Sequence, residues 1–414
     1  MNEPKLRFKN DNGKQFPDWE EKRVADVANR VKVGFVGACE RYYTDKNGIP
    51  LYRTGNLQLG KLIEDDMKYV SKEFHIANKK SQLHKGDILV ARHGSSGNAV
   101  LYNSEKEANC LNIVIIQPNL KTVNPKFMVE SINSPNVVKQ VSRLKNGSTQ
   151  VVLNTKDIEN LDVNIPSLSE QQKIALLFSE LDTLIESAEK ELEGYRELKQ
   201  GMLQKMFPKN GEKVPEIRFP EFTGDWEQHK LGEVAPLRGG YAFKSDKYKT
   251  EGTPIVRISN ILSDGSVGAE FAYYDDIEDD EKCTLGNGDA LLAMSGATTG
   301  KVSILKCNNN DKYYQNQRVG YFERNEQYNY GFVSTIVRSD LFKEQLTLVL
   351  VAGAQPNVSS KEIDAFEFMF PNSIVEQKKI GEYFSNLDNL IALQQQELDG
   401  YKELKKGLLQ QMFC

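Results

Sequence analysis

Cysteine and histidine are scarce in this chain and never occur at a short, regular spacing. The five cysteines are odd in number, lie far apart and include no CxxC pair, and the four histidines stand singly. Zinc sites and redox centres need such residues close together in the sequence. We therefore expect reduced thiols, no disulfide framework and no metal site. The residues concerned are Cys39, Cys110, Cys283, Cys307, Cys414, His75, His84, His93 and His229.

Long apolar runs are also missing. No uninterrupted apolar stretch approaches the roughly 20 residues of a membrane-spanning helix, and residues 1–12 are too polar for a secretion signal. The chain has 414 residues, 39% of them hydrophobic, which is enough to bury the cores of two domains. These features predict a two-domain protein of the cytoplasm.

Known catalytic motifs are absent as well. A P-loop is excluded at residues 296–301, because this stretch has three residues between its glycines and no Ser or Thr after its lysine. The acidic residues 275–281 lack the glycine and alternating ligands of a calcium loop. The sequence contains no nucleophile elbow, HExxH helix, dinucleotide fingerprint or Asn/Asp-Pro-Pro-aromatic methyltransferase motif. We therefore predict that the chain is not an enzyme; the rival here is a hydrolase with a site in the Gly-Asp turns.

What the sequence does contain is an internal repeat of about two hundred residues. Residues 178–207 return as residues 384–413, with the same Phe-Ser-x-Leu-Asp-x-Leu-Ile start and the same Met-Phe end. Further matches at drifting offsets, such as residues 83–89 with 285–291, indicate loop insertions around a shared framework. A repeat of this length is a domain with its connecting helix rather than a solenoid unit.

Each copy is predicted to be a globular half followed by a long helix. Short β-branched runs separated by Gly, Asn and Asp indicate strands, and residues 125–144 and 330–350 indicate helices, so each half is expected to be α+β. The expected boundaries are residues 1–165 for the first domain, 166–214 for the first helix and linker, 215–371 for the second domain and 372–414 for the second helix.

Apolar residues recur at steps of three and four along both helices, which is typical of a coiled-coil seam. Each helix follows a proline and opens with Glu-Gln, at residues 170–171 and 376–377, where an acidic side chain suits the positive end of the helix dipole. We predict an antiparallel coiled coil between the two copies; the alternative is that each helix packs on its own domain. The predicted seam consists of Leu177, Leu181, Leu184, Leu192, Tyr195, Leu198, Leu387, Leu390, Leu398, Tyr401, Leu404 and Leu408.

Several of these anchors together resemble the specificity subunits of type I restriction-modification systems. They include Gly-Gly-Tyr-Ala-Phe-Lys-Ser at residues 239–245 and Gly-Thr-Pro-Ile-Val-Arg-Ile-Ser-Asn-Ile at residues 252–261. The passages that lead into the two Glu-Gln helix starts, residues 147–174 and 353–380, resemble the family in the same way. The resemblance covers nearly the whole chain, twice over and in the same order, although no single motif is diagnostic.

The resemblance implies a DNA-binding protein without catalysis of its own. In this family, two target-recognition domains each read one half of a split, asymmetric DNA sequence, and the conserved helices set the gap between the halves. Two modification subunits, which carry S-adenosylmethionine and methylate adenine, would bind this chain. Restriction subunits that use ATP and magnesium would join them to translocate and cut DNA. No cofactor is expected in the chain itself.

We expect base contacts from polar side chains on the Gly-rich turns, because these side chains carry suitable donors and acceptors. Ser and Thr in turns also satisfy local backbone groups, which is the competing role. Arg53 with Asn56, and Arg257 with Asn260, recur in both copies, so a shared framework or phosphate-positioning role suits them better than base discrimination. The DNA-binding candidates are Arg92, His93, Ser95, Ser96, Asn98, Ser148, Thr149, Gln150, Tyr241, Lys244, Arg257, Ser295, Thr298, Thr299, Lys301, Gln355 and Asn357.

Charge is the main objection to DNA binding, because the formal net charge is −5. Residues 1–165 hold 25 basic against 19 acidic residues, whereas residues 215–371 hold 16 against 24. The second domain must therefore present a local basic face. The negative charge also supports the rival interpretation, a two-module protein-interaction scaffold with a coiled-coil spacer and no DNA binding. The candidates for the basic face are Arg238, Lys244, Lys247, Lys249, Arg257 and Lys301.

Overall fold

A computed structural model describes residues 4–144, 152–209, 211–352 and 357–413. The chain forms two compact units, and their boundaries fall inside the two long helices. The first unit is Met1–Glu189 together with Gln396–Cys414, and the second is Lys190–Gln395. Both units combine strands and helices, which confirms the predicted α+β class.

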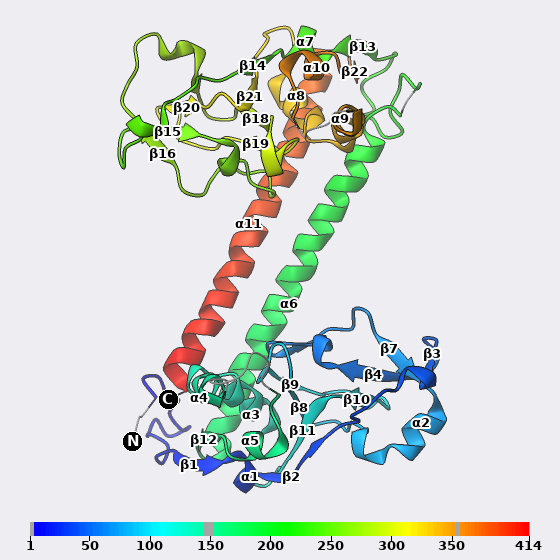
Figure 1. The fold of residues 1–414 in the computed structure, drawn as a ribbon, viewed down its shortest axis with the longest axis vertical. Helices are drawn as coiled ribbons and strands as arrows, with labels where there is room; N and C mark the ends of the chain where they lie inside the picture. The colour runs from blue at the N-terminus through cyan, green and yellow to red at the C-terminus, as the bar shows by residue number, and fades with distance from the viewer. Residues whose placement is uncertain (1–3, 145–151, 210, 353–356, 414) are drawn as a thin grey trace. The chain divides into compact units, whose positions relative to one another are not determined.

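The first unit is built around a four-stranded sheet in the order β2-β11-β8-β9 (Figure 1). The central strands β8 and β11 are almost wholly apolar because both faces of this sheet are covered. Ile88, Val90 and Val114 face a core that includes helix residues, while Leu89 and Ile115 face a second core. The strands of this sheet are β2 (Ala28–Val33), β8 (Ile88–Ala91), β9 (Ala99–Leu101) and β11 (Ile113–Pro118).

Shorter sheets and helices complete the first unit. A second four-stranded sheet has the order β10-β4-β7-β3, and two strand pairs, β1-β12 and β5-β6, are antiparallel. These strands are β1 (Glu20–Arg23), β3 (Tyr43–Thr44), β4 (Ile49–Arg53), β5 (Leu57–Gln58), β6 (Lys61–Leu62), β7 (Lys68–Val70), β10 (Asn109–Leu111) and β12 (Asp162–Ile165). The helices are α1 (Val24–Val27), α2 (Lys72–Ala77), α3 (Pro125–Ile132), α4 (Pro135–Leu144) and α5 (Thr155–Glu159).

The single helix expected over residues 125–144 is two helices, α3 and α4. Pro135 begins α4, and proline disfavours the helical conformation of the residue before it. The break between the two helices holds Asn133 against strand β9. Its side-chain amide accepts a hydrogen bond from Ala99 N at 2.9 Å and donates one to Ala99 O at 2.8 Å. The stretch 330–350 divides in the same way, into α8 (Tyr330–Ile336) and α9 (Asp340–Ala352).

The second unit repeats this plan with the sheets β14-β21-β18-β19 and β16-β15-β20-β17 and the pair β13-β22. Its strands are β13 (Glu227–Lys230), β14 (Leu237–Gly239), β15 (Thr253–Val256), β16 (Ala272–Tyr274), β17 (Thr284–Leu285), β18 (Ala290–Ala293), β19 (Val302–Ile304), β20 (Tyr313–Gln315), β21 (Val319–Phe322) and β22 (Glu367–Phe370). Its remaining helices are α7 (Leu231–Val234) and α10 (Ser360–Asp364).

The repeated Gly-Asp motif forms the same turn in both units. Gly86 and Gly288 have φ of +93° and +83°, which favours glycine. The Asp87 carboxylate accepts a hydrogen bond from His84 N at 2.9 Å, and Asp289 accepts one from Gly286 N at 2.8 Å. The turn is therefore a folding element, and it offers no support for a hydrolytic site.

The two long helices are α6 (Leu168–Lys205) and α11 (Ile374–Met412), and they pair within each unit. In the first unit, Lys405 contacts Asp182 at 2.6 Å and Lys402 contacts Glu189 at 3.0 Å. Residue numbers rise along α6 as they fall along α11, so the helices run antiparallel there. In the second unit, Lys199 contacts Asp388 at 2.5 Å, and Arg196 donates to Gln395 at 3.2 Å, with the same sense. The predicted antiparallel helix pairing is confirmed.

The predicted seam is wrong at four leucines. Leu184, Leu198, Leu390 and Leu404 are 46%, 45%, 42% and 52% exposed. Each stands one residue before a less exposed position, at residues 185, 199, 391 and 405. Steps of four and three along α6 therefore select Leu181, Ile185, Ala188, Leu192, Tyr195 and Lys199 as its seam. Leu181, Leu192, Leu387 and Leu398 are buried, and Leu177, Tyr195, Tyr401 and Leu408 are partly buried.

Candidate nucleic-acid interface

The described residues include no group of three or more His, Cys, Asp or Glu side chains that could hold a metal ion. In the acidic stretch 275–281, Asp276 contacts Lys312 at 3.2 Å, and Asp280 forms an ion pair with the same lysine. Hydrogen bonds from Thr253 and Lys312 hold the pKa of Asp276 below its ordinary value. Lys249 also contacts Asp275, so this stretch is an acidic loop held by two lysines.

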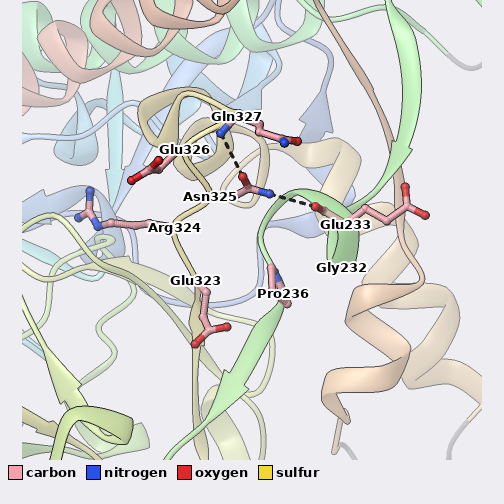
Figure 2. Close-up of a pocket in the computed structure, with 8 residues that line it drawn as sticks. All are labelled: Gly232, Glu233, Pro236, Glu323, Arg324, Asn325, Glu326 and Gln327. Atoms are coloured by element: carbon pink, nitrogen blue, oxygen red, sulfur yellow. Dashed lines mark hydrogen bonds between the residues drawn. The ribbon is translucent and has the colours of Figure 1, made fainter.

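An open depression in the second unit is lined mostly by polar residues, among which Arg324 and Asn325 are bound to the fold through their side chains (Figure 2). Asn325 donates to Glu233 O at 3.3 Å and accepts from Gln327 N at 3.0 Å, and Arg324 pairs with Asp289 at 3.0 Å. The lining contains no Ser, Thr, Cys, His or Lys, so it offers no pairing of a hydroxyl or thiol nucleophile with a histidine or lysine base. It consists of Gly232, Glu233, Pro236, Glu323, Arg324, Asn325, Glu326 and Gln327.

The first Gly-rich turn, residues 92–98, connects β8 to β9 and packs on α4. Gly97 has φ of +97°, and a Cβ there would lie 2.9 Å from Val141, so the turn needs glycine at this point. Arg92 donates through Nε to Leu153 O at 2.9 Å, and Ser96 donates to Arg92 O at 3.1 Å. These two candidates shape the turn. Within the described part of the chain, no hydrogen bond or ion pair engages the side chains of His93, Ser95 and Asn98.

The second Gly-rich turn, residues 294–301, connects β18 to β19, is one residue longer than the first and carries different side chains. Gly300 has φ of +87°, and its Cβ would lie 2.4 Å from Leu346 on α9, as Gly97 meets α4. Thr298 donates to Ile258 O at 3.1 Å, Thr299 donates to Gly296 O at 2.7 Å, and Lys301 donates to Ser263 at 2.7 Å. Three of the candidates on this turn thus support the fold locally.

Arg257 and its counterpart Arg53 lie in a repeated turn. Asn56 and Asn260 accept hydrogen bonds from the Arg53 and Arg257 backbone N–H at 2.9 and 3.0 Å, and each asparagine donates to two carbonyls of the following loop. The guanidinium groups bind the Asp66 and Glu270 carbonyls at 2.6 and 3.1 Å. These contacts fit the framework role suggested by their recurrence.

The remaining candidates divide into two groups. Ser148, Thr149, Gln150 and Gln355 lie outside the described residues, whereas Asn357 precedes Val358, whose N–H donates to Met294 O at 3.0 Å. Tyr241 is 51% exposed, Lys244 is exposed and Ser295 is partly exposed. Among the basic-face candidates, Arg238 contacts Glu323 at 3.6 Å and Lys249 contacts Asp275 at 2.5 Å.

Sequence reasoning missed two exposed residues beside Tyr241, Gln317 and Arg318. They occupy the connection between β20 and β21, which spans residues 316–318 in the second unit. The equivalent connection between β10 and β11 in the first unit is Asn112 alone. Aligning the two copies strand by strand would have revealed this length difference, whereas matching motifs did not.

Comparison with known proteins agrees with this geometry. The family described as type I restriction modification DNA specificity domain matches the chain twice, at residues 17–194 and 223–402. The chain therefore belongs to this family and contains two of its domains. Within the described residues, no helix is both long and apolar enough to cross a membrane.

Individual relatives support the same assignment. The chain is 26% identical over 418 residues to the type I restriction enzyme MjaVIII specificity subunit of Methanocaldococcus jannaschii, covering 97% of this chain and 94% of the relative. It is 27% identical over 195 residues to the EcoBI specificity subunit of Escherichia coli, covering 46% of this chain and 41% of the relative. A crystal structure of the type I restriction-modification S subunit from M. genitalium shares the fold, with a TM-score of 0.69, 16% identity and coverage of 100% and 99% of the two chains.

Proposed function

We propose that this chain reads DNA for a type I restriction-modification complex, each unit recognising one half of a split, asymmetric target. One observation carries the proposal: the two units share their framework turns, but the side chains on the equivalent Gly-rich turns differ. The side chains without a described hydrogen bond or ion pair are His93, Ser95 and Asn98 on the first turn, whereas Ser295 is the corresponding candidate on the second. Similar scaffolds with unlike polar side chains suit a reader of two different base sequences.

The helices dock the partner subunits in this proposal. The antiparallel register places Leu184 beside Leu404 in the first unit, and Leu198 beside Leu390 in the second. All four are about half exposed, and they lie on the flank away from the ion pairs. Covering exposed apolar pairs of this kind with a partner removes apolar surface from water, which lowers the free energy of the complex. Two equivalent pairs fit two copies of one modification subunit.

Catalysis belongs to these partners. The modification subunits bind S-adenosylmethionine and methylate adenine, and restriction subunits use ATP and magnesium to translocate and cut DNA. The chain itself directs this chemistry in the cytoplasm without a cofactor of its own. The Gly-Asp turns, where a hydrolytic site was the rival interpretation, are engaged in local backbone hydrogen bonds.

The deciding experiment combines the chain with its modification subunits and maps methylated adenines on random-sequence DNA. We expect methylation confined to one split sequence with unlike halves. Leu184→Ser with Leu404→Ser should weaken partner binding by at least tenfold, since two half-exposed leucines lose their burial in the complex. Leu120→Ser, at a leucine 65% exposed outside the helices, is the matched control. A complex that forms but methylates without sequence preference would instead support the interaction-scaffold interpretation.

A further inference from the structure

Three separate segments of the second unit meet at the end of the sheet β14-β21-β18 (Figure 1). Tyr241 N donates to Gln315 O at 2.9 Å, and Gln317 N donates to Tyr241 O at 2.8 Å. On the other side, Met294 N donates to Arg318 O at 3.0 Å. The loop after β14, the connection between β20 and β21, and the Gly-rich turn after β18 therefore lie side by side.

The middle segment is a tight turn that presents its two corner residues to solvent. Val319 N donates to Asn316 O at 2.9 Å, which closes a four-residue turn with Gln317 and Arg318 at its corners. Both side chains are exposed. The neighbouring loop approaches this turn closely, because a Cβ on Gly240 would lie 2.3 Å from Asn316 O. The positions of the two corner residues are therefore fixed by backbone contacts.

The side chains at this edge are available to a ligand. Among the described residues, no hydrogen bond or ion pair engages the side chains of Lys244, Ser295, Gln317 or Arg318. This contrasts with other basic residues of the same unit, since Lys249, Lys312 and Arg324 each pair with an aspartate. Lys244 and Arg318 thus remain without a described ion pair in a domain with an acidic excess, as Lys282 does elsewhere in the unit.

The first unit lacks this surface. Phe35 stands where the second unit has Tyr241, and its ring packs on Phe74 with centroids 5.0 Å apart. Asn112, with φ of +56°, replaces the whole turn. The exposed turn at residues 316–319 is therefore particular to the second unit.

We propose that Gln317 and Arg318, beside Tyr241, Lys244 and Ser295, form the surface through which the second unit reads its DNA half-site; this rests on the proposed function. Arg318 contacts a guanine edge, since a guanidinium matches the two acceptors of guanine in the major groove, and Gln317 has the donor and acceptor that match adenine. Lys244 neutralises phosphate, and Tyr241 supplies an exposed ring and hydroxyl.

The test uses the chain in complex with its modification subunits and measures methylation of DNA altered at either half-site. Arg318→Ala should lower methylation of the intact target by about tenfold or more and relax discrimination at the second half-site only. Arg318→Lys keeps the positive charge but loses the planar guanidinium with its paired N–H donors. It should therefore retain binding to non-specific DNA while losing the same discrimination. Lys282→Ala, an exposed lysine elsewhere in the second unit, is the matched control.

The outcomes separate this inference from the proposed function. If the wild-type complex reads a split sequence and Arg318→Ala matches Lys282→Ala in rate and discrimination, the surface is assigned wrongly while the function stands. Altered discrimination at the first half-site would overturn the assignment as well. A wild-type complex without sequence preference would remove both. Because Arg318 makes no described side-chain contact, its variants should melt at the wild-type temperature, which excludes misfolding as the cause of a loss.

Discussion

In each unit, an aspartate at the equivalent position of the repeat links the globular part to the helix pair. Its partners differ between the two units. In the first unit, Asp182 on α6 contacts Lys405 of α11 at 2.6 Å and forms an ion pair with Lys126 of α3. In the second, Asp388 on α11 contacts Lys199 of α6 and Arg338 of the α8–α9 connection, each at 2.5 Å. Each carboxylate therefore joins two helices and the domain at one point.

The two units differ in how many carboxylates compensate the two cations around each aspartate. The first unit adds a second carboxylate, Glu130, which is 1% exposed and contacts Lys126 at 2.5 Å and Lys405 at 3.6 Å. Thr335 occupies the equivalent place on α8, three residues after the phenylalanine that the N-cap asparagine binds in both units. The joint is thus repeated while its surroundings have diverged, as expected where a geometry is shared and side chains around it vary.

The C-terminal ends of the two long helices carry matching aromatic clusters. Phe207 packs against Trp226, Phe332 and Phe384 with ring centroids 5.5 to 6.1 Å apart. Phe413 repeats these contacts in the first unit, against Trp19, Phe127 and Phe178 at 5.5 to 6.1 Å. Phe207 continues into a linker, whereas Phe413 comes from the far end of the chain. The segment before each domain binds the end of a long helix. Leu6 N donates to Gln411 O at 3.0 Å, and Ile217 N donates to Lys205 O at 2.8 Å.

The largest expected effect is the loss of stability on removing the phenylalanine of either aromatic cluster, Phe413 in the first unit or Phe207 in the second. Phe413→Ala should destabilise the first unit by about 3–5 kcal/mol, and Phe207→Ala should destabilise the second by a similar amount, because each removes a buried ring. Hydrogen exchange read separately over the two units measures both. Leu120→Ala, at an exposed side chain of the first unit, should change neither. Loss of protection in the second unit of Phe413→Ala would show that the clusters are assigned to the wrong units.

Removing Asp388 or Asp182 should reduce stability by less than removing either phenylalanine, and the two losses should differ. Asp388→Ala leaves Arg338 and Lys199 without their shared carboxylate, and we expect a loss of about 3 kcal/mol, the lower end for a broken buried ion pair. Asp182→Ala should cost about half as much, because Glu130 still compensates Lys126 and Lys405. Denaturant unfolding of each variant tests this order. Equal losses would mean that Glu130 contributes nothing to the first joint, and Glu130→Gln added to Asp182→Ala would then have no further effect.

The smallest expected effect is the loss of stability at acid pH that comes from the Asp388 ion pairs. Burial raises the pKa of Asp388, but Arg338 and Lys199 lower it further, so it lies below the ordinary 3.8. A carboxylate with a depressed folded-state pKa contributes stability above its unfolded-state pKa and loses it as the pH falls through the folded-state value. Wild-type stability should therefore fall more steeply below about pH 4 than that of Asp388→Asn. Parallel curves for the two proteins would contradict the pairing.

The framework was largely visible in the sequence, because repeated motifs have local physical causes. The Glu-Gln helix starts are an example. Glu170 and Glu376 are buried and bind Arg7 and Arg218 through two hydrogen bonds each. Their glutamine neighbours also satisfy backbone groups, as Gln171 does by accepting from Asn124 N at 2.8 Å. The sequence located these residues but explained them only by the helix dipole, since their partners lie far away in the chain.

The errors came from places where three-dimensional register decides. Leu198 looks like a better seam residue than Lys199, and Leu404 than Lys405, yet the helix turns Lys199 inward to meet Asp388. Lys405 does the same toward Asp182. Hydrophobicity alone favours the leucines, so only the partner helix reveals the choice. Gln317 and Arg318 were missed for a related reason, because their exposure depends on the register of β20 and β21 against the neighbouring strands.

The central claim is that the repeated framework sets geometry while the unrepeated surfaces carry the target sequence. A chimera that replaces residues 20–165 with a second copy of residues 227–370 tests this most directly, with methylated sequences mapped in the complex with modification subunits. Two identical domains on antiparallel helices should modify a symmetric target, the second half-site followed by its inverted copy, with the wild-type gap. Continued methylation of the asymmetric wild-type sequence would contradict the claim.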